Sequence, residues 1–102
     1  MLNAKQKKRF RAIGHELKPV VTIAGNGLSD NVLNELNRAL DDHELIKVKI
    51  IGDREERGII VKELSTLPST EVVQQIGGVA LVYRAAREPN PALSNILRSN
   101  LL

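Results

Sequence analysis

The sequence contains no cysteine and no tryptophan, and its only aromatic side chains are those of Phe10 and Tyr83. Without cysteine there is no disulfide, no thiolate metal site and no cysteine nucleophile, which fits a reducing compartment. Two aromatic rings are too few for a base-stacking platform of the RRM type or for an aromatic single-strand channel. These absences exclude several routes to catalysis and to nucleic-acid recognition.

Long apolar runs are absent as well. No segment approaches the ~18 consecutive apolar residues of a membrane span, and the amino terminus lacks the apolar core of a signal peptide. The length of 102 residues suits one domain, because domains cluster near ~100–150 residues. We therefore expect a soluble, cytoplasmic, monomeric protein with no membrane partner.

The sequence also offers little for catalysis. Its two histidines, His15 and His43, lie in different segments, and no carboxylate cluster has the spacing of metal ligands. An enzyme would need a nucleophile beside a base, or a metal cluster. We expect no enzymatic activity, no cofactor and no metal site, and we interpret His43 as a turn residue.

Positive charge is concentrated at the amino end. Residues 1–18 hold six basic side chains and one acid, whereas residues 19–102 hold nine basic and eleven acidic side chains. Phe10, Ile13 and Leu17 recur at helical spacing until Pro19, which predicts a helix over 4–16 behind a capping box at 3–6. We expect no acid within reach to neutralise the basic side chains of residues 5–11, so a polyanion partner is favoured over a merely solvated helix face.

The segment Lys18–Ser29 is a short apolar strand that runs into a glycine-containing loop and then into a helix start. Glycines at 25 and 27 allow a ligand to approach the backbone, and the following helix points free N–H groups and its positive dipole end at the loop. A phosphate site fits this pattern. An ordinary strand-to-helix turn at Asn26-Gly27, with Ser29 as a simple N-cap, fits it too.

The remaining elements follow from periodicity and turn signals. We predict a helix over 30–42, a strand over 45–51, a helix from the capping box at 53–56 to Pro68, and strands over 72–76 and 79–84. Gly77-Gly78 indicates an antiparallel hairpin. The prolines after Arg84 indicate a break, so we assign 1–84 to the domain and 85–102 to a carboxy-terminal tail that contains at most a loose helix.

The element order α-β-α-β-α-β-β predicts the fold class. Strand–helix–strand units place strands in parallel through right-handed crossovers, and the hairpin adds an antiparallel pair. We expect a single compact α/β domain with a four-stranded mixed sheet and packed helices. In the strand over 45–51, Lys47 and Lys49 face away from the apolar side chains, where they either bind phosphate or simply discourage aggregation.

Four blocks of the sequence resemble the CRM domain (chloroplast RNA splicing and ribosome maturation) in its stand-alone bacterial YhbY-like form. They are His15–Val21, Gly25–Leu28, His43–Ile50 and Val82–Arg84, and the match spans about residues 3–84. The resemblance implies an RNA-binding domain with a fold similar to the carboxy-terminal domain of translation initiation factor three. It also implies binding to ribosomal RNA in precursors of the large ribosomal subunit, and a role in their assembly.

The family's loop is similar to the GxxG loop of KH domains, but the first position here is Ala24. If that position needs a positive φ or a direct approach of the backbone to a phosphate, alanine costs on the order of 1 kcal/mol. If it ends the strand with a negative φ, alanine costs little and Gly25 takes the strained role. From the basic residues and this loop we expect RNA to contact Lys5, Lys7, Lys8, Arg9, Arg11, Lys18, Ala24, Gly25, Asn26, Gly27, Lys47, Lys49 and Arg84. The alternative is a protein-docking module of a ribonucleoprotein complex that does not contact RNA.

Overall fold

The structure is a computed structural model that describes residues 2–24 and 27–99. Among these residues it contains three helices and four strands in the predicted order. They are α1 (Ala4–Gly14), β1 (Pro19–Ile23), α2 (Asp30–His43), β2 (Leu45–Ile50), α3 (Arg54–Thr66), β3 (Glu71–Ile76) and β4 (Val79–Tyr83). The predicted fold class is confirmed, and α1 ends two residues earlier than expected, at Gly14.

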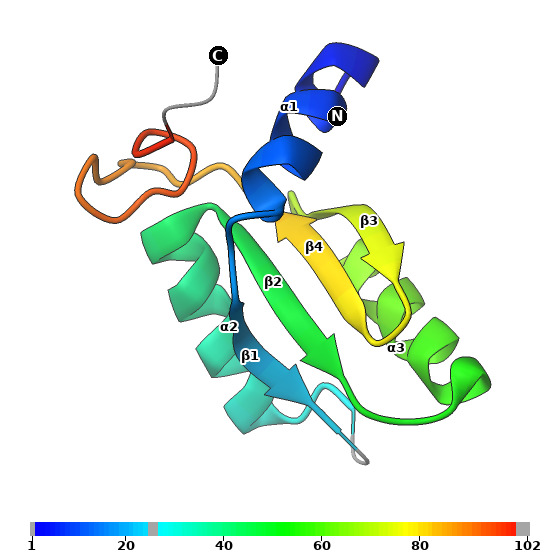
Figure 1. The fold of residues 1–102 in the computed structure, drawn as a ribbon. Helices are drawn as coiled ribbons and strands as arrows, with labels where there is room; N and C mark the ends of the chain where they lie inside the picture. The colour runs from blue at the N-terminus through cyan, green and yellow to red at the C-terminus, as the bar shows by residue number, and fades with distance from the viewer. Residues whose placement is uncertain (1, 25–26, 100–102) are drawn as a thin grey trace.

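The four strands form one mixed sheet in the order β1-β2-β4-β3 (Figure 1). The crossover through α2 makes β1 and β2 parallel, whereas β4 runs antiparallel to both of its neighbours, β2 and β3. The hairpin predicted at Gly77-Gly78 is confirmed, with Ile76 paired to Val79 and a φ of 56° at Gly77. That positive φ is a conformation that glycine adopts without steric cost.

Both predicted capping boxes are present. The Asn3 side chain accepts the Gln6 N–H at 2.8 Å, and the Gln6 side chain accepts the Asn3 N–H at 3.0 Å. Asp53 and Glu56 make the same reciprocal pair at the start of α3. A cap of this kind stabilises a helix by about 1 kcal/mol, so the sequence sets where α1 and α3 begin.

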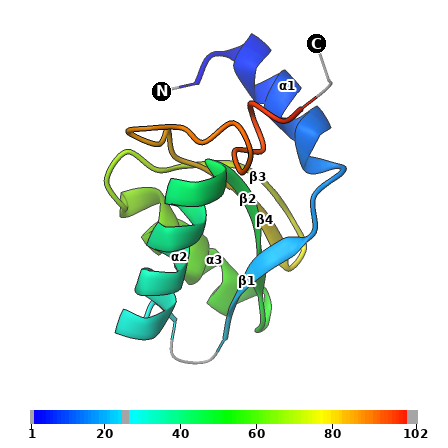
Figure 2. The same ribbon diagram turned by 90° about the vertical axis from the view of Figure 1, so that its left-hand side faces the viewer.

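Helices lie on both faces of the sheet (Figures 1 and 2), and a buried cluster lies on each face. On one face, α2 and α3 bury a large cluster that includes Ile23, Leu36, Val48, Leu64 and Val82. On the other face, α1 packs Phe10 and Ile13 against Leu45 and Leu81. The Phe10 and Tyr83 rings meet there with their centroids 4.7 Å apart.

Helix α1 covers only one end of its face. Lys47 and Lys49 continue the side of β2 that begins with Leu45 under α1. Their paired residues Pro19 and Thr22 on β1 are exposed and Val79 on β4 is half-buried, whereas Leu81, which pairs with Lys47, is buried against α1. We call this uncovered area the open sheet face, and Figure 1 looks onto it, with α1 above and α2 and α3 behind. Its side chains are those of Val20, Thr22, Lys47, Lys49, Gln74, Ile76 and Val79.

The segment after β4 differs from the loose helix that we expected. Residues 85–99 contain turns rather than a helix, and they pack between the end of α2 and α1 (Figure 2). The buried Ser94 donates its hydroxyl to Glu44 Oε1 at 2.6 Å, the Ala86 N–H donates to Glu44 Oε2 at 2.9 Å, and Asn95 Nδ2 donates to the Leu45 carbonyl at 2.7 Å. Ile96 also packs against the cluster of Phe10 and Leu45, but the polar contacts of the segment could not be indicated by apolar periodicity.

Candidate nucleic-acid interface

Helix α1 supplies most of the positive charge. Lys5 and Lys8 are exposed and have no hydrogen-bond or ion-pair partner within residues 2–24 and 27–99. Arg9 is exposed as well and donates from Nη2 to the Ile96 carbonyl at 3.5 Å, while Arg11 is half-buried. The charge of α1 is therefore displayed to solvent, with Arg9 also touching the carboxy-terminal segment.

The expectation that no acid neutralises residues 5–11 is wrong for Lys7. Its Nζ lies 3.7 Å from Glu71 Oε2, because α1 packs across the start of β3. Glu71 is far from Lys7 in the sequence, and only the fold brings the two together. The nearby carboxylate partly offsets the positive charge of Lys7, which therefore attracts an anionic ligand less than Lys5 or Lys8 does.

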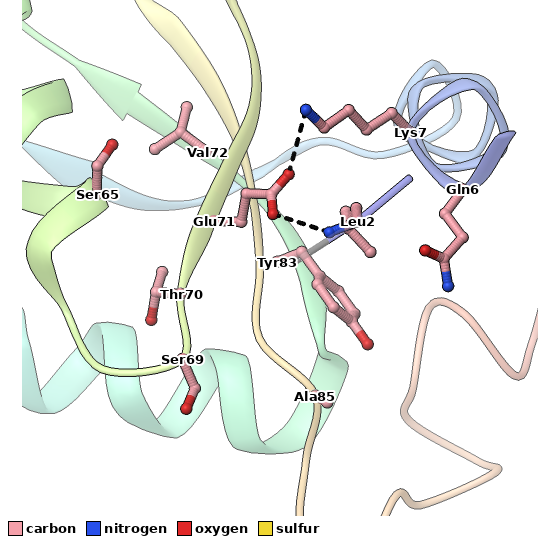
Figure 3. A pocket seen from close by; sticks show the side chains of 10 residues that line it. All are labelled: Leu2, Gln6, Lys7, Ser65, Ser69, Thr70, Glu71, Val72, Tyr83 and Ala85. Carbon is pink, nitrogen blue, oxygen red and sulfur yellow. Dashed lines mark hydrogen bonds and ion pairs between the residues drawn. The ribbon is translucent and has the colours of Figure 1, made fainter. Parts of the chain in front are cut away.

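Glu71 lies in the wall of a wide hollow of about 810 Å³ between α1, β3 and the end of α3 (Figure 3). Its Oε1 accepts the Leu2 N–H at 3.1 Å, and its Oε2, which is buried, faces Lys7. The Tyr83 ring lines the same hollow, and burial together with the charge of Glu44 raises the pKa of Tyr83 above its ordinary 10.0. A carboxylate beside a neutral phenol makes this hollow a poor site for phosphate.

In the loop before α2, the structure describes Ala24 and Gly27. The predicted contacts Gly25 and Asn26 lie outside the described residues. Ala24 does not have a positive φ, since Glu44 and Ser69 are the non-glycine residues with one in the described ranges, whereas Gly27 has a φ of 65°. Alanine at position 24 is therefore unstrained. The positive φ that the sequence left open for position 24 is therefore not observed.

Several donors at the start of α2 are already used. The Gly27 N–H donates to the Ala24 carbonyl at 2.9 Å, the Ser29 N–H to the Gly27 carbonyl at 3.0 Å, and the Val32 N–H to Ser29 Oγ at 3.3 Å. Ser29 is thus the N-cap that the sequence predicted. The N–H groups of Asp30 and Asn31 remain as the first-turn donors with no intrahelical acceptor.

An acid also stands close to the loop. A Cβ atom added at Gly27 would lie 3.7 Å from Glu63 Oε2 of α3. That carboxylate opposes an anion bound beside Gly27, and Asp30 in the first turn of α2 adds a second negative charge. The described part of the loop therefore combines donors that attract phosphate with acids that repel it.

The four remaining lysines and arginines of the predicted set separate into two groups. Lys18 is exposed between α1 and β1, and Lys47 and Lys49 lie on the open sheet face, so all three are on the side of α1. Arg84 is placed elsewhere: its Nε donates to Thr70 Oγ1 at 3.0 Å and its Nη1 to Asn37 Oδ1 of α2 at 2.9 Å. Its guanidinium joins structural elements behind the sheet.

Sequence reasoning missed the neutral side chains that surround Lys47 and Lys49. Gln74 and Ile76 of β3, together with His15 at the end of α1, meet Lys47 around one small hollow. Strand alternation could have indicated that Gln74 and Ile76 share a face. Only the strand order could show that this face adjoins β4 and then β2.

Within residues 2–24 and 27–99, no group of three or more His, Cys, Asp or Glu side chains could hold a metal ion. None of the helices in these ranges combines the length and the apolar character needed to span a bilayer.

Comparison with known proteins identifies relatives that match nearly the whole chain. A probable RNA-binding protein of Pseudomonas aeruginosa is 52% identical over 98 residues, which cover 95% of this chain and 94% of that protein. An RNA-binding protein of Haemophilus influenzae is 42% identical over 88 residues, covering 85% and 89% of the two chains.

A solved structure and a family model agree with these relatives. The solution structure of a hypothetical protein from Staphylococcus aureus, described as a candidate RNA-binding protein, is 29% identical with a TM-score of 0.75 and covers 92% of this chain and 98% of that one. The model of the CRS1 / YhbY (CRM) domain matches residues 2–84. The resemblance carried by the four sequence blocks is confirmed, and the chain belongs to the CRS1/YhbY (CRM) domain family.

Proposed function

We propose that this protein binds RNA, mainly through the phosphate backbone. The observation that carries the proposal is the side-by-side placement of α1, with five basic residues and no acid, and the open sheet face, with Lys47 and Lys49. Phosphate contacts dominate the affinity of most proteins for nucleic acids, and such contacts need cations rather than aromatic rings. The names of the relatives support the same partner.

The contacts that we propose are those of Lys5, Lys8, Arg9, Arg11, Lys18, Lys47 and Lys49, with a smaller part for Lys7 because of Glu71. The loop at 24–27 is a secondary contact, since acids stand beside its described end. Arg84 is left out because its guanidinium already has two partners behind the sheet.

The RNA that we propose is ribosomal RNA in precursors of the large ribosomal subunit, whose assembly the protein would assist as a cytoplasmic monomer. This step rests on the family to which the chain belongs. It requires binding only and no chemistry. Sequencing the RNA cross-linked to the protein in cells tests it, together with co-sedimentation with large-subunit precursors, and cross-links confined to messenger RNA would contradict it.

A salt titration of RNA affinity tests the backbone-directed mode. For a single strand, log K should fall against log salt with a slope of about 0.7 for each phosphate contact, so several contacts give a steep line. A slope near zero would contradict the proposal. It would favour the docking of a protein through exposed apolar side chains such as Val20 and Ile76, which are 51% and 65% exposed.

A further inference from the structure

The open sheet face lies between the two segments that the proposed function uses for phosphate. Its upper edge meets the end of α1, and its lower edge meets the end of β1, where the loop at 24–27 begins (Figure 1). The pairing of Pro19 with Lys47 and of Thr22 with Lys49 sets the two lysines in successive rows between these edges. A chain of phosphates that touched both α1 and the loop would cross this face.

The same face contains a small hollow. Its volume is about 230 Å³, and its lining includes His15 from α1, Lys47 from β2, Val79 from β4, and Gln74 and Ile76 from β3. Pockets that enclose a drug-sized ligand measure roughly 300–1,000 Å³, so this one suits a single base or ribose. Of the described residues that line it none is acidic, in contrast to the larger hollow beside Glu71.

The lining supplies two kinds of contact for one nucleotide. Ile76 and Val79 offer an aliphatic surface for the apolar face of a base, and the Gln74 amide offers both a donor and an acceptor for a base edge. Lys47 has no ion-pair partner within residues 2–24 and 27–99, which leaves its ammonium for the adjoining phosphate.

We propose that this hollow on the open sheet face holds an unpaired nucleotide, with its base or ribose against Ile76 and Val79 and its phosphate on Lys47 and Lys49. The inference rests on the proposed RNA binding and adds that the protein selects single-stranded or bulged RNA over a continuous duplex. In an A-form duplex the bases are stacked and paired, so a protein reaches mainly phosphates and 2′-hydroxyls. A duplex would touch the lysines and leave the hollow empty.

Charge complementarity favours RNA over a protein as the occupant. Among the described residues, the side chains that line the hollow or lie on the open sheet face include Lys47, Lys49 and His15 and no carboxylate, and Lys18 comes directly before β1. A polyanion strand gains from each of these groups, whereas an apolar protein surface would leave the lysines to be desolvated.

The test compares two RNA probes and matched pairs of variants. The probes are an oligouridylate of about 12 nucleotides, within the ~4–16 nucleotides of known single-strand sites, and an RNA duplex of about 16 base pairs. Ile76→Ser is matched by Ile59→Ser, since Ile59 is a similarly exposed isoleucine of α3 (53% against 65%). Lys47→Gln is matched in the same way by Lys62→Gln on α3.

We expect Ile76→Ser to weaken oligouridylate binding by about three- to tenfold and to leave duplex binding unchanged, because only the unpaired base uses the aliphatic surface. Gln74→Ala should act in the same direction, and Ile59→Ser should change neither affinity. In the unmodified protein, the methyl signals of Ile76 and Val79 should shift on addition of oligouridylate, while that of Ile59 stays in place.

Three results would overturn the inference, and they are distinguishable. If the protein binds oligouridylate while these methyl signals stay fixed and Ile76→Ser binds normally, the hollow is unoccupied and the proposed function stands. If the protein binds neither probe nor cellular RNA, the proposed function fails. If Ile76→Ser removes a contact with ribosomal particles that survives ribonuclease treatment, the face docks a protein instead.

Discussion

The two faces of the sheet carry opposite charge over equally apolar cores. Helix α1, on one face, has five basic residues and no acid, whereas α2 and α3, on the other, together have seven acids and four basic residues. Both sides bury apolar side chains against the strands, although α1 covers only one end of its face, so the difference in charge lies in what each side presents to solvent. Burial of apolar side chains stabilises the fold on both faces of the sheet, and the charge of the covering helices distinguishes one face from the other.

This segregation has a consequence for a polyanion partner. A net charge of +3 spread evenly would attract RNA weakly from every direction. With the excess placed on α1 and the open sheet face, attraction is concentrated on one side, and the acidic helices repel the strand from the other. Such an arrangement orients the partner as well as attracting it.

The largest expected effect is the loss of RNA affinity when cations are removed from the α1 side of the sheet only. Replacing Lys5 and Lys8 with Gln should lower RNA affinity on the order of tenfold at low salt and flatten the salt slope by about 1.4, since each phosphate contact on a single strand contributes about 0.7. The matched double variant on α3, Arg54→Gln with Lys62→Gln, should leave the RNA affinity and the salt slope unchanged. Equal losses from the two pairs would show that only total charge matters.

The next effect concerns the segment that joins the two sides, because residues 85–99 connect the end of α2 to α1. Ser94→Ala deprives the buried Glu44 carboxylate of its 2.6 Å hydrogen bond and should lower the free energy of unfolding by about 1–3 kcal/mol. Thermal or denaturant unfolding measures this change in the free energy of unfolding. Ser65→Ala, on the exposed surface of α3, is the control and should change stability little.

If Ser94→Ala proves as harmless as Ser65→Ala, the segment is an appendage and α1 is held by its apolar contacts alone. A loss of stability would show instead that residues 85–99 belong to the folded unit. The methyl groups of Ile96, which packs with Phe10 and Leu45, report the same distinction through their chemical shifts.

A smaller effect is expected where the acidic side meets the loop. Glu63→Gln removes the carboxylate near Gly27 and should raise RNA affinity by about two- to fivefold if phosphate binds there, since an exposed charge pair is worth about 1 kcal/mol or less. Glu55→Gln removes an equal charge from the start of α3 and should have a weaker effect. An unchanged affinity for Glu63→Gln would mean that the loop is an ordinary turn.

The smallest expected effect is a pH dependence of the folding stability, which arises from Tyr83 beneath α1. The raised pKa of Tyr83 means that its folded state holds the phenol proton more tightly than the unfolded chain does. The resulting stability is complete below the ordinary Tyr pKa of 10.0 and is lost as pH rises through the higher folded value. Unfolding measured across this alkaline range should show a steeper fall than Tyr83→Phe does, and identical slopes would contradict the assignment.

Most of the fold could be predicted from local sequence signals. The capping boxes at Asn3 and Asp53, the turn at Gly77-Gly78 and the alternation in β2 depend on neighbours within a few residues, and the structure confirms each of them. The charge of α1 could likewise be recognised from the sequence, because the helical period alone places its basic side chains around the apolar stripe.

Contacts between distant segments could not be recognised in this way. Glu71 reaches Lys7, Glu63 approaches Gly27, and Ser94 reaches Glu44 only because strand order and helix packing bring them together. No periodicity encodes such polar pairs, since each depends on the register of β-strands set by the whole core.

The sequence by itself determined the elements, their order and the charge of the amino-terminal helix, because propensity, capping and periodicity act over a few residues. Only the tertiary structure decided that α1 covers one end of one sheet face, that Lys47 and Lys49 lie on the open sheet face beside Gln74 and Ile76, and that Arg84 points away. These placements follow from how far a short helix extends across a four-stranded sheet, a property of packed surfaces rather than of any local stretch of chain.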